Sequence, residues 1–181
     1  MKAHTLLIVD DQEVNRKILR RLLQNDYEIL EAENGQVALD ILRNNLDVVS
    51  AVLLDIVMPV MDGYTMLGEM QHDAELSKIP VIVSSQKDGD EAEIHALSLG
   101  AQDFIAKPYK VDIIRHRLEN TIRLRETAAM VNRAEKDELT GVLNKPFFIE
   151  QVENTLRQNP EAEYNMLCFD IEKFKLVNDT Y

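Results

Sequence analysis

The stretch from Ala51 to Gly63, AVLLDIVMPVMDG, limits the possible folds more than any other part of the chain. Its apolar run, Ala51 to Leu54, is too short for an amphipathic helix and is typical of a strand buried on both faces of a parallel sheet. Asp55 interrupts this run near the end of the strand. In doubly wound sheets the carboxyl ends of the strands form the ligand site, so Asp55 is a candidate functional residue. The alternative is that Asp55 only caps the following turn.

The first 120 residues repeat a pattern of a short apolar strand followed by a helix. In the first helix, from Val14 to Leu23, the apolar residues fall at helical spacing and the basic residues, including Arg16, are expected to face solvent. Five such alternations predict a parallel sheet with helices on both sides. We expect strands at 5–9, 27–32, 51–57 and 79–83 and a fifth strand that contains residues 104–105 and ends at Lys107-Pro108. We expect helices at 14–23, 37–42, 64–70 and 90–99 and a last helix from 112.

Length and composition narrow the class of protein. The chain has 181 residues with 45% hydrophobic content, enough for one core of ordinary size and a remainder. A net charge of −12 without a block of Lys and Arg argues against a nucleic-acid surface. The single cysteine, Cys168, cannot form an internal disulfide. No leading apolar segment and no run long enough to span a membrane is present, so we expect a cytoplasmic protein.

Three acids share a predicted position at the carboxyl ends of strands. Asp10 and Asp11 follow the first strand, and Asp55 lies near the end of the third. Three carboxylates in one crevice repel one another unless a cation lies between them. Oxygen ligands without nearby His or Cys favour Mg²⁺ over zinc. Capping of the first helix is the alternative for one member of the Asp10–Asp11 pair.

Four separated motifs, LLIVDDQ, DIVMPVMDG, PVIVSS and GAQDFIAKPY, closely resemble the receiver domain of two-component response regulators. The resemblance covers about residues 4–122, and we expect a receiver domain at 1–122. It implies a flavodoxin-like (βα)5 doubly wound fold. It also implies phosphoryl transfer from a sensor histidine kinase or a phosphotransfer protein.

The resemblance assigns a role to each motif residue. It implies that Asp55 is the phosphoryl acceptor and that Lys107 is the invariant cation. It implies that Asp11 and the Val57 carbonyl are Mg²⁺ ligands and that Asp10 helps to hold the ion. It also implies that Ser85 is the switch hydroxyl and that Phe104 is the aromatic that reorients. Alternation along a strand allows only one of Ser84 and Ser85 to reach the site, and the family spacing selects Ser85. Phe104 as plain core and Lys107 as a surface residue are the alternatives.

Two departures from common receivers bear on the lifetime of the phosphorylated state. Val57 stands two residues beyond the acceptor Asp55. Lys87 stands two residues beyond the switch residue Ser85, and Gln86 lies between Ser85 and Lys87. The Val57 side chain cannot hold a water by hydrogen bonding, and a charged Lys87 cannot act as a base. We therefore expect slow hydrolysis of the acyl phosphate.

The last receiver helix is expected to continue as a helical linker through residues 123–136. The apolar residues Val111, Ile114, Leu118 and Ile122 form a stripe. We interpret it as more than packing on the sheet requires, and it predicts a homodimer through the fourth and fifth helices. Beyond Ile122 the stripe thins, so an exposed, charged linker helix remains equally open.

A second resemblance begins at Asp137. The segments DELTGVLNKPFF and LCFDIEKFKLVNDTY, at residues 137–181, resemble the N-terminal part of a GGDEF diguanylate cyclase domain. The resemblance implies that Asp170, at the end of a strand at 165–169, and the Ile171 carbonyl are magnesium ligands and that Asn178 contacts guanine.

The GGDEF signature loop does not occur in these residues, so we expect no cyclase activity from this chain. A full-length parent would be a diguanylate cyclase that uses GTP, with phosphorylation controlling dimerisation. The alternative function is a non-enzymatic adaptor that acts through phosphorylation-dependent protein contacts.

Overall fold

The structure is a computed structural model that describes residues 4–85, 90–137 and 140–167, with the backbone alone at 90 and 132–134. The chain divides into two compact units, residues 1–130 and 131–181. Within the described residues, no helix combines the length and apolar character needed to cross a membrane.

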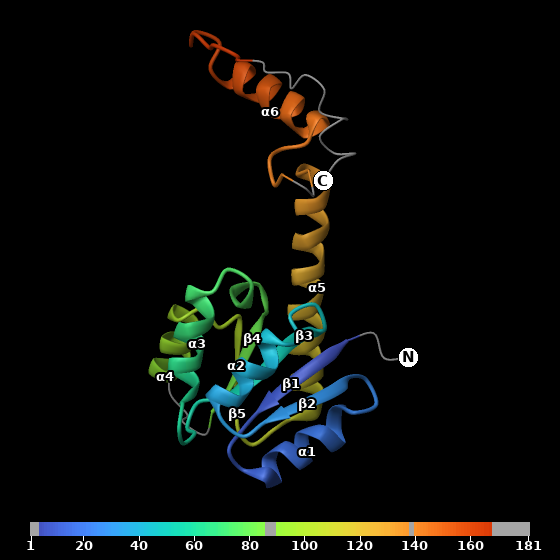
Figure 1. The fold of residues 1–181 in the computed structure, drawn as a ribbon, viewed down its shortest axis with the longest axis vertical. Coiled ribbons are helices and arrows are strands. Elements are labelled where there is room, and N and C mark those ends of the chain that lie inside the picture. The colour runs from blue at the N-terminus through green and yellow to red at the C-terminus, as the bar shows by residue number, and fades with distance from the viewer. Residues whose placement is uncertain (1–3, 86–89, 138–139, 168–181) are drawn as a thin grey trace, which may run out of the picture. The chain divides into compact units, whose positions relative to one another are not determined.

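The first unit is built on a five-stranded parallel sheet with strand order β2-β1-β3-β4-β5 (Figure 1). The strands are β1 (Thr5–Val9), β2 (Glu28–Ala32), β3 (Val49–Asp55), β4 (Val81–Ser85) and β5 (Asp103–Ala106). The helices are α1 (Glu13–Leu23), α2 (Gly35–Arg43), α3 (Gly63–His72), α4 (Asp90–Ser98), α5 (Val111–Glu135) and α6 (Lys145–Gln158), with a 3₁₀ turn η1 (Leu76–Lys78). This architecture confirms the predicted flavodoxin-like (βα)5 fold.

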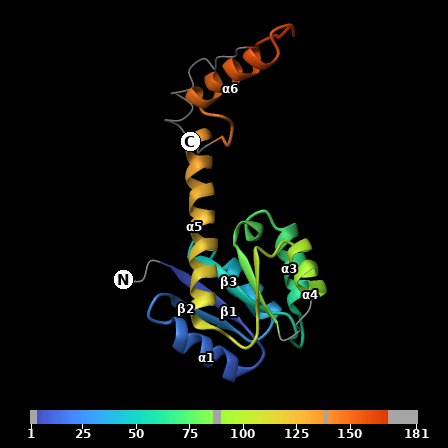
Figure 2. The same ribbon diagram turned by 180° about the vertical axis from the view of Figure 1, so that it is seen from behind.

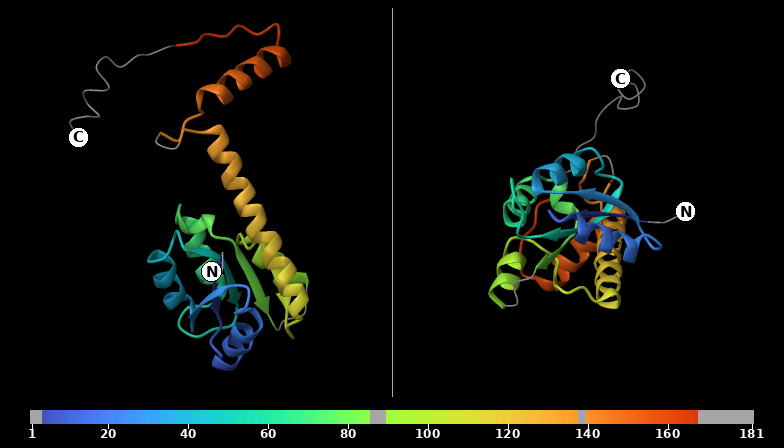
Figure 3. Two further views of the ribbon diagram at one scale, coloured as in Figure 1. Left: turned by 90° about the vertical axis from the view of Figure 1, so that its right-hand side faces the viewer. Right: turned by 90° about the horizontal axis from the view of Figure 1, so that it is seen from below.

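Two hydrophobic layers cover the two faces of the sheet. One layer packs α2, α3 and the buried Ala96 of α4 against one face. The other packs Leu19 and Leu23 of α1 and the inner side of α5 against the opposite face. Figures 1 and 2 show α3 and α4 together on one side of the sheet, and Figure 3 gives two further views. The strands therefore read as continuous apolar runs because both faces are buried.

Local sequence signals fix where several helices begin and end. The side chains of Asn34 and Asp62 accept hydrogen bonds from the backbone N–H groups of Val37 and Thr65, which caps α2 and α3. Gly100 adopts φ +94° just after α4, as a helix stop requires. At Gly63 an added Cβ would lie 2.4 Å from the carbonyl oxygen of Asp55, so only glycine permits this close approach beside the end of β3.

The long helix α5 runs without interruption from Val111 to Glu135, as the sequence predicts. Its apolar stripe does not form a free seam, however. Ile114, Leu118 and Ile122 have exposed fractions of 0%, 0% and 4% and belong to the core layer that α5 shares with α1. The interpretation of this stripe as a surplus for dimerisation is therefore wrong, because packing on the sheet buries Ile114, Leu118 and Ile122.

The second unit consists, in its described part, of α6 and the turns that flank it. Asn144 caps α6 by accepting a hydrogen bond from the Phe147 N–H, and no residue of α6 is buried. A single isolated bridge joins Lys136 and Leu143. In the predicted strand at 165–169, residues 165–167 are not in a strand, and the rest lies outside the described residues. A strand needs a hydrogen-bonded partner, and the described residues beside 165–167 supply none.

Candidate functional site

The candidate site lies where β1 and β3, neighbours in the sheet, end side by side. Val9 pairs with Leu54, so Asp10 and Asp55 emerge next to each other. Each of Asp10, Asp11 and Asp55 offers a carboxylate oxygen within 4.8 Å of the others. The direction of the chain connections reverses between β1 and β3, and such points are where doubly wound sheets bind ligands.

Lys107 enters this cluster from the end of β5. Its Nζ lies 2.8 Å from Asp10 Oδ2 and 3.0 Å from Asp55 Oδ2, and the lysine side chain is only 8% exposed. The Lys107 backbone N–H donates to the Ser85 carbonyl at 2.9 Å, which ties it to β4. The Lys107–Pro108 peptide bond is cis. One ammonium group is thus shared by two carboxylates from different strands.

The pKa values of Asp55 and Lys107 are both raised, for different reasons. Burial raises the pKa of Asp55, and the nearby Asp10 adds to the rise, while Lys107 opposes it. For Lys107, burial alone would lower the pKa, but its hydrogen bonds to Asp10 and Asp55 and the nearby Tyr109 raise it well above its ordinary value. Lys107 therefore stays charged at neutral pH, and the ionised form of Asp55 is held at a cost.

Asp10 is fixed by partners that the sequence reasoning did not identify. Its Oδ1 accepts from the Gln12 backbone N–H at 2.9 Å and from Asn15 Nδ2 at 3.0 Å. Arg16 Nη1 donates to the backbone carbonyls of Asp10 and Asp11, at 2.7 and 3.2 Å. Arg16 is only 13% exposed and also pairs with Glu31, so its predicted outward orientation is wrong. The backbone carbonyls after β1 turn the guanidinium inward, which a helical-spacing rule cannot anticipate.

Asp11 carries a carboxylate oxygen that is suited to bind a cation. Its buried Oδ1 has no hydrogen-bond partner among the described residues. Three carboxylates meet one ammonium group, so two negative charges stay uncompensated when all are ionised. An orphaned carboxylate oxygen and surplus negative charge fit a hard divalent cation with oxygen ligands. The residues present therefore suit a metal such as Mg²⁺.

The remaining predicted receiver residues lie around this cluster or on nearby strands. Ser85 ends β4 and is buried, at 2% exposed, and Phe104 lies in β5 at 7% exposed. The Ser84 hydroxyl lies 3.4 Å from the Leu54 carbonyl oxygen and 3.4 Å from the Tyr109 hydroxyl. The side chain of Val57 is 63% exposed just beyond Asp55. Gln86, Lys87, Asp170, Ile171 and Asn178 lie outside the described residues.

Comparison with known proteins identifies the family to which this chain belongs. Residues 6–119 match the family model of the response regulator receiver domain, and residues 134–181 match that of the diguanylate cyclase, GGDEF domain. The chain therefore belongs to the response regulator receiver family, and its receiver domain is followed by a GGDEF segment.

Individual relatives agree with this placement. The chain is 34% identical over 178 residues to "Histidine kinase P4" of Formosa agariphila, covering 93% of this chain and 12% of that protein. It is 33% identical over 159 residues to a "Probable cyclic di-GMP phosphodiesterase" of Vibrio cholerae, covering 88% of this chain and 33% of that protein. The chain thus spans a third or less of these curated relatives.

A solved structure supports the fold directly. The crystal structure of a putative response regulator from Chloroflexus aurantiacus matches with a TM-score of 0.63 and 31% identity, over 67% of this chain and 99% of that one.

Proposed function

We propose that this chain is the phosphoryl-accepting part of a two-component response regulator and that Asp55 is the acceptor. The observation that carries the proposal is the buried cluster at the ends of β1, β3 and β5, in which Lys107 bridges Asp10 and Asp55 and Asp11 holds an unpartnered oxygen. The donor would be a phosphohistidine on a sensor histidine kinase or a phosphotransfer protein.

The chemistry is an exchange of one bond to phosphorus for another. A carboxylate oxygen of Asp55 attacks the phosphorus, the phosphorus–nitrogen bond of the phosphohistidine breaks, and its electron pair stays on the imidazole. Lys107 already contacts Asp55 Oδ2 at 3.0 Å, so it places a fixed positive charge where phosphoryl oxygens would arrive. Because Lys107 is buried and held by Asp10, little reorganisation is needed during the transfer.

Asp10, Asp11, Asp55 and the carbonyl of Val57 are the groups that we assign to Mg²⁺. When bound, the ion would neutralise the carboxylates and the phosphoryl oxygens. Ser85, buried at the end of β4, would donate to a phosphoryl oxygen after transfer, and Phe104 would reorient with it.

The output that we propose is a diguanylate cyclase. We place the receiver at 1–122, a helical linker at 123–136 and the GGDEF segment at 137–181. The family matches at 6–119 and 134–181 support this division. In the complete protein, Asp170, the Ile171 carbonyl and Asn178 would serve the metal and the guanine of GTP. The predicted cytoplasmic location belongs to the same proposal.

Control of the output would act through a homodimer formed by α4 and α5. The stripe at Ile114 is buried, so the proposed dimer surface must use other apolar side chains. On α4, Ile94 is 65% exposed and Leu97 is 42% exposed, and on α5 Ile113 is 43% exposed. Ile113 also borders a cavity of about 350 Å³ beside β5.

The test of phosphoryl acceptance is labelling with acetyl phosphate and Mg²⁺, followed by intact mass measurement. We expect one phosphoryl group on the parent and none on Asp55→Asn. Asp62→Asn is the matched control, because Asp62 is exposed at the end of the loop that follows Asp55, and an asparagine can keep its cap on Thr65. Full labelling of Asp55→Asn would remove Asp55 from the proposed role.

The test of the dimer surface is sedimentation of the beryllofluoride-treated chain. We expect Ile113→Glu to weaken dimerisation and Ile18→Glu to leave it unchanged, since Ile18 is similarly exposed, at 45%, but lies on α1. Equal behaviour of the two variants would count against the α4 and α5 surface.

A further inference from the structure

Helix α5 loses its contact with the receiver core soon after Ile122, the last residue of its buried stripe. From residue 123 to residue 130 every side chain is exposed except that of Arg125, which is partly buried. Apolar packing therefore cannot hold this part of α5. Any attachment to the receiver must come from Arg125 or from weak surface contacts.

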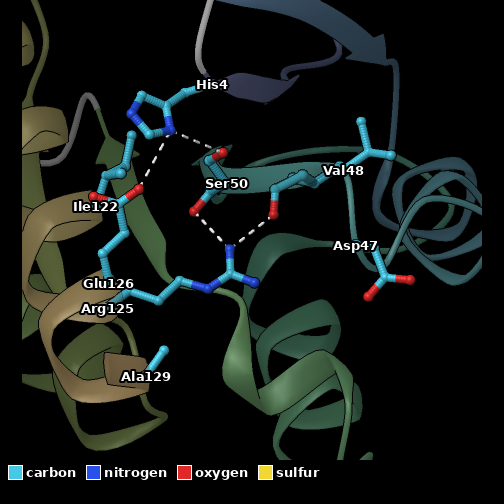
Figure 4. A pocket seen from close by; sticks show the side chains of 9 residues that line it. His4, Asp47, Val48, Ser50, Ile122, Arg125, Glu126 and Ala129 are labelled. Carbon is cyan, nitrogen blue, oxygen red and sulfur yellow. Dashed lines mark hydrogen bonds and ion pairs between the residues drawn. The ribbon is translucent and has the colours of Figure 1, made fainter. Parts of the chain in front are cut away.

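Arg125 contacts the backbone at the beginning of β3. Its Nη1 donates to the carbonyl oxygens of Val49 and Ser50, at 2.8 and 3.0 Å (Figure 4). The pairing of β3 with β1 is irregular at this point: Thr5 pairs with Val49 and Leu6 pairs with Ala51, which leaves Ser50 without a partner in β1. A bulge of this kind interrupts the ladder and re-aims backbone groups. The Nη1 group of Arg125 thus donates hydrogen bonds to both carbonyl oxygens.

The surroundings of Arg125 make this contact specific. The side chain borders a cavity of about 270 Å³ between α5 and the start of β3, together with His4, Asp47 and Glu126. Figure 4 shows the guanidinium group reaching across this cavity to the strand. His4 Nδ1 lies 3.4 Å from Ser50 Oγ and 3.9 Å from Glu126 Oε1, so the same corner of β3 is also linked to α5 through a second, weaker set of contacts.

We propose that Arg125 is a positioning residue that fastens the outer part of α5 to the amino end of the acceptor strand. The bonded carbonyls belong to the first two residues of β3, and Asp55 is the last residue of the same strand. The strand β3 thus joins the Arg125 contact to the opposite edge of the sheet, where the carboxylate cluster lies. The contact holds residues 123–130 of α5 against the receiver. This assignment stands on the contacts alone and does not depend on phosphoryl acceptance.

The experiment is hydrogen exchange of the backbone amides of residues 123–130, measured by mass spectrometry on the full chain without phosphoryl donor. Arg125→Met removes the donors and retains most of the apolar stem. Arg123→Met is the matched control, because Arg123 lies on the same helix and its described bond is to Asn120 of that helix, at 2.9 Å. Exchange in β1 and β3 serves as the internal reference for global opening.

We expect Arg125→Met to speed exchange at residues 123–130 by at least about tenfold, as the loss of charge-assisted hydrogen bonds implies, with β1 and β3 unchanged. Arg123→Met should behave like the parent. Arg125→Met could also speed exchange throughout the receiver. In that case Arg125→Lys, which keeps a charge and a donor, replaces it in the same comparison. Arg125→Lys should show a smaller increase in exchange rate, confined to residues 123–130. Exchange at 123–130 equal to that of the Arg123 control overturns the proposal.

Discussion

Replacing Lys107 by methionine should destabilise the receiver strongly, because it leaves two buried carboxylates without their cation. Lys107 is 8% exposed, and its partners Asp10 and Asp55 are 1% and 8% exposed. Removing one member of a buried ion pair typically costs about 3–5 kcal/mol, since the remaining charge is uncompensated. With a urea slope of about 2 kcal/mol per molar, the unfolding midpoint should fall by about 2 M.

The assay is urea unfolding followed by far-ultraviolet circular dichroism, at pH 7.5 and without Mg²⁺. Lys78→Met is the control: Lys78 and Glu75 pair at 2.6 Å but are 63% and 60% exposed, so the loss should be less than about 1 kcal/mol. Equal midpoints for the two variants would refute the reasoning that burial makes the Lys107 contacts strong. Adding Mg²⁺ should narrow the gap between Lys107→Met and the parent.

The pH dependence follows from the direction of the two shifts. The folded state raises the pKa of Lys107, so its stabilising contribution is complete below the unfolded value of about 10.4 and is lost only as the pH rises through the higher folded value. The folded state also raises the pKa of Asp55, so proton binding by Asp55 favours folding as the pH falls. Lys107 opposes that rise, and without it Asp55 should take up its proton at a still higher pH. The deficit of Lys107→Met should therefore shrink on acidification.

In calorimetric titration, Asp11→Ala should weaken Mg²⁺ binding at least tenfold, about 1.4 kcal/mol, because it removes a ligand. The control Asp62→Asn should leave the Mg²⁺ affinity unchanged. An unchanged affinity in Asp11→Ala would show that Asp11 has only a structural role. Leu118→Ala should lower the free energy of unfolding by about 2–5 kcal/mol, because Leu118 is fully buried. Leu124→Ala, at a 69% exposed position, should cost less than about 0.5 kcal/mol, and similar losses would contradict the burial of the α5 stripe. Val57→Asn should shorten the lifetime of the phosphorylated chain, since an amide can hold the attacking water; an unchanged decay rate would show that this side chain does not control it.

The fold followed from sequence because each of its signals is local. Buried parallel strands appear as continuous apolar runs, and caps such as Asn34 and Asp62 mark helix starts through their own backbone bonds. The positions of Asp10, Asp11 and Asp55 also followed, since the carboxyl ends of parallel strands share one edge of the sheet.

The tertiary structure alone decided which atoms the long charged side chains contact and which face of α5 is free. Lys107 reaches Asp10 across 97 positions of sequence, and Arg125 reaches Val49 across 76. Arg16 turns inward to backbone carbonyls, although its spacing places it on the polar face of α1. Hydrophobic periodicity reports how much apolar surface an element carries, but not which neighbour covers it or where a flexible charged group finds acceptors. Those contacts arise only when strands that are distant in sequence become adjacent in the sheet.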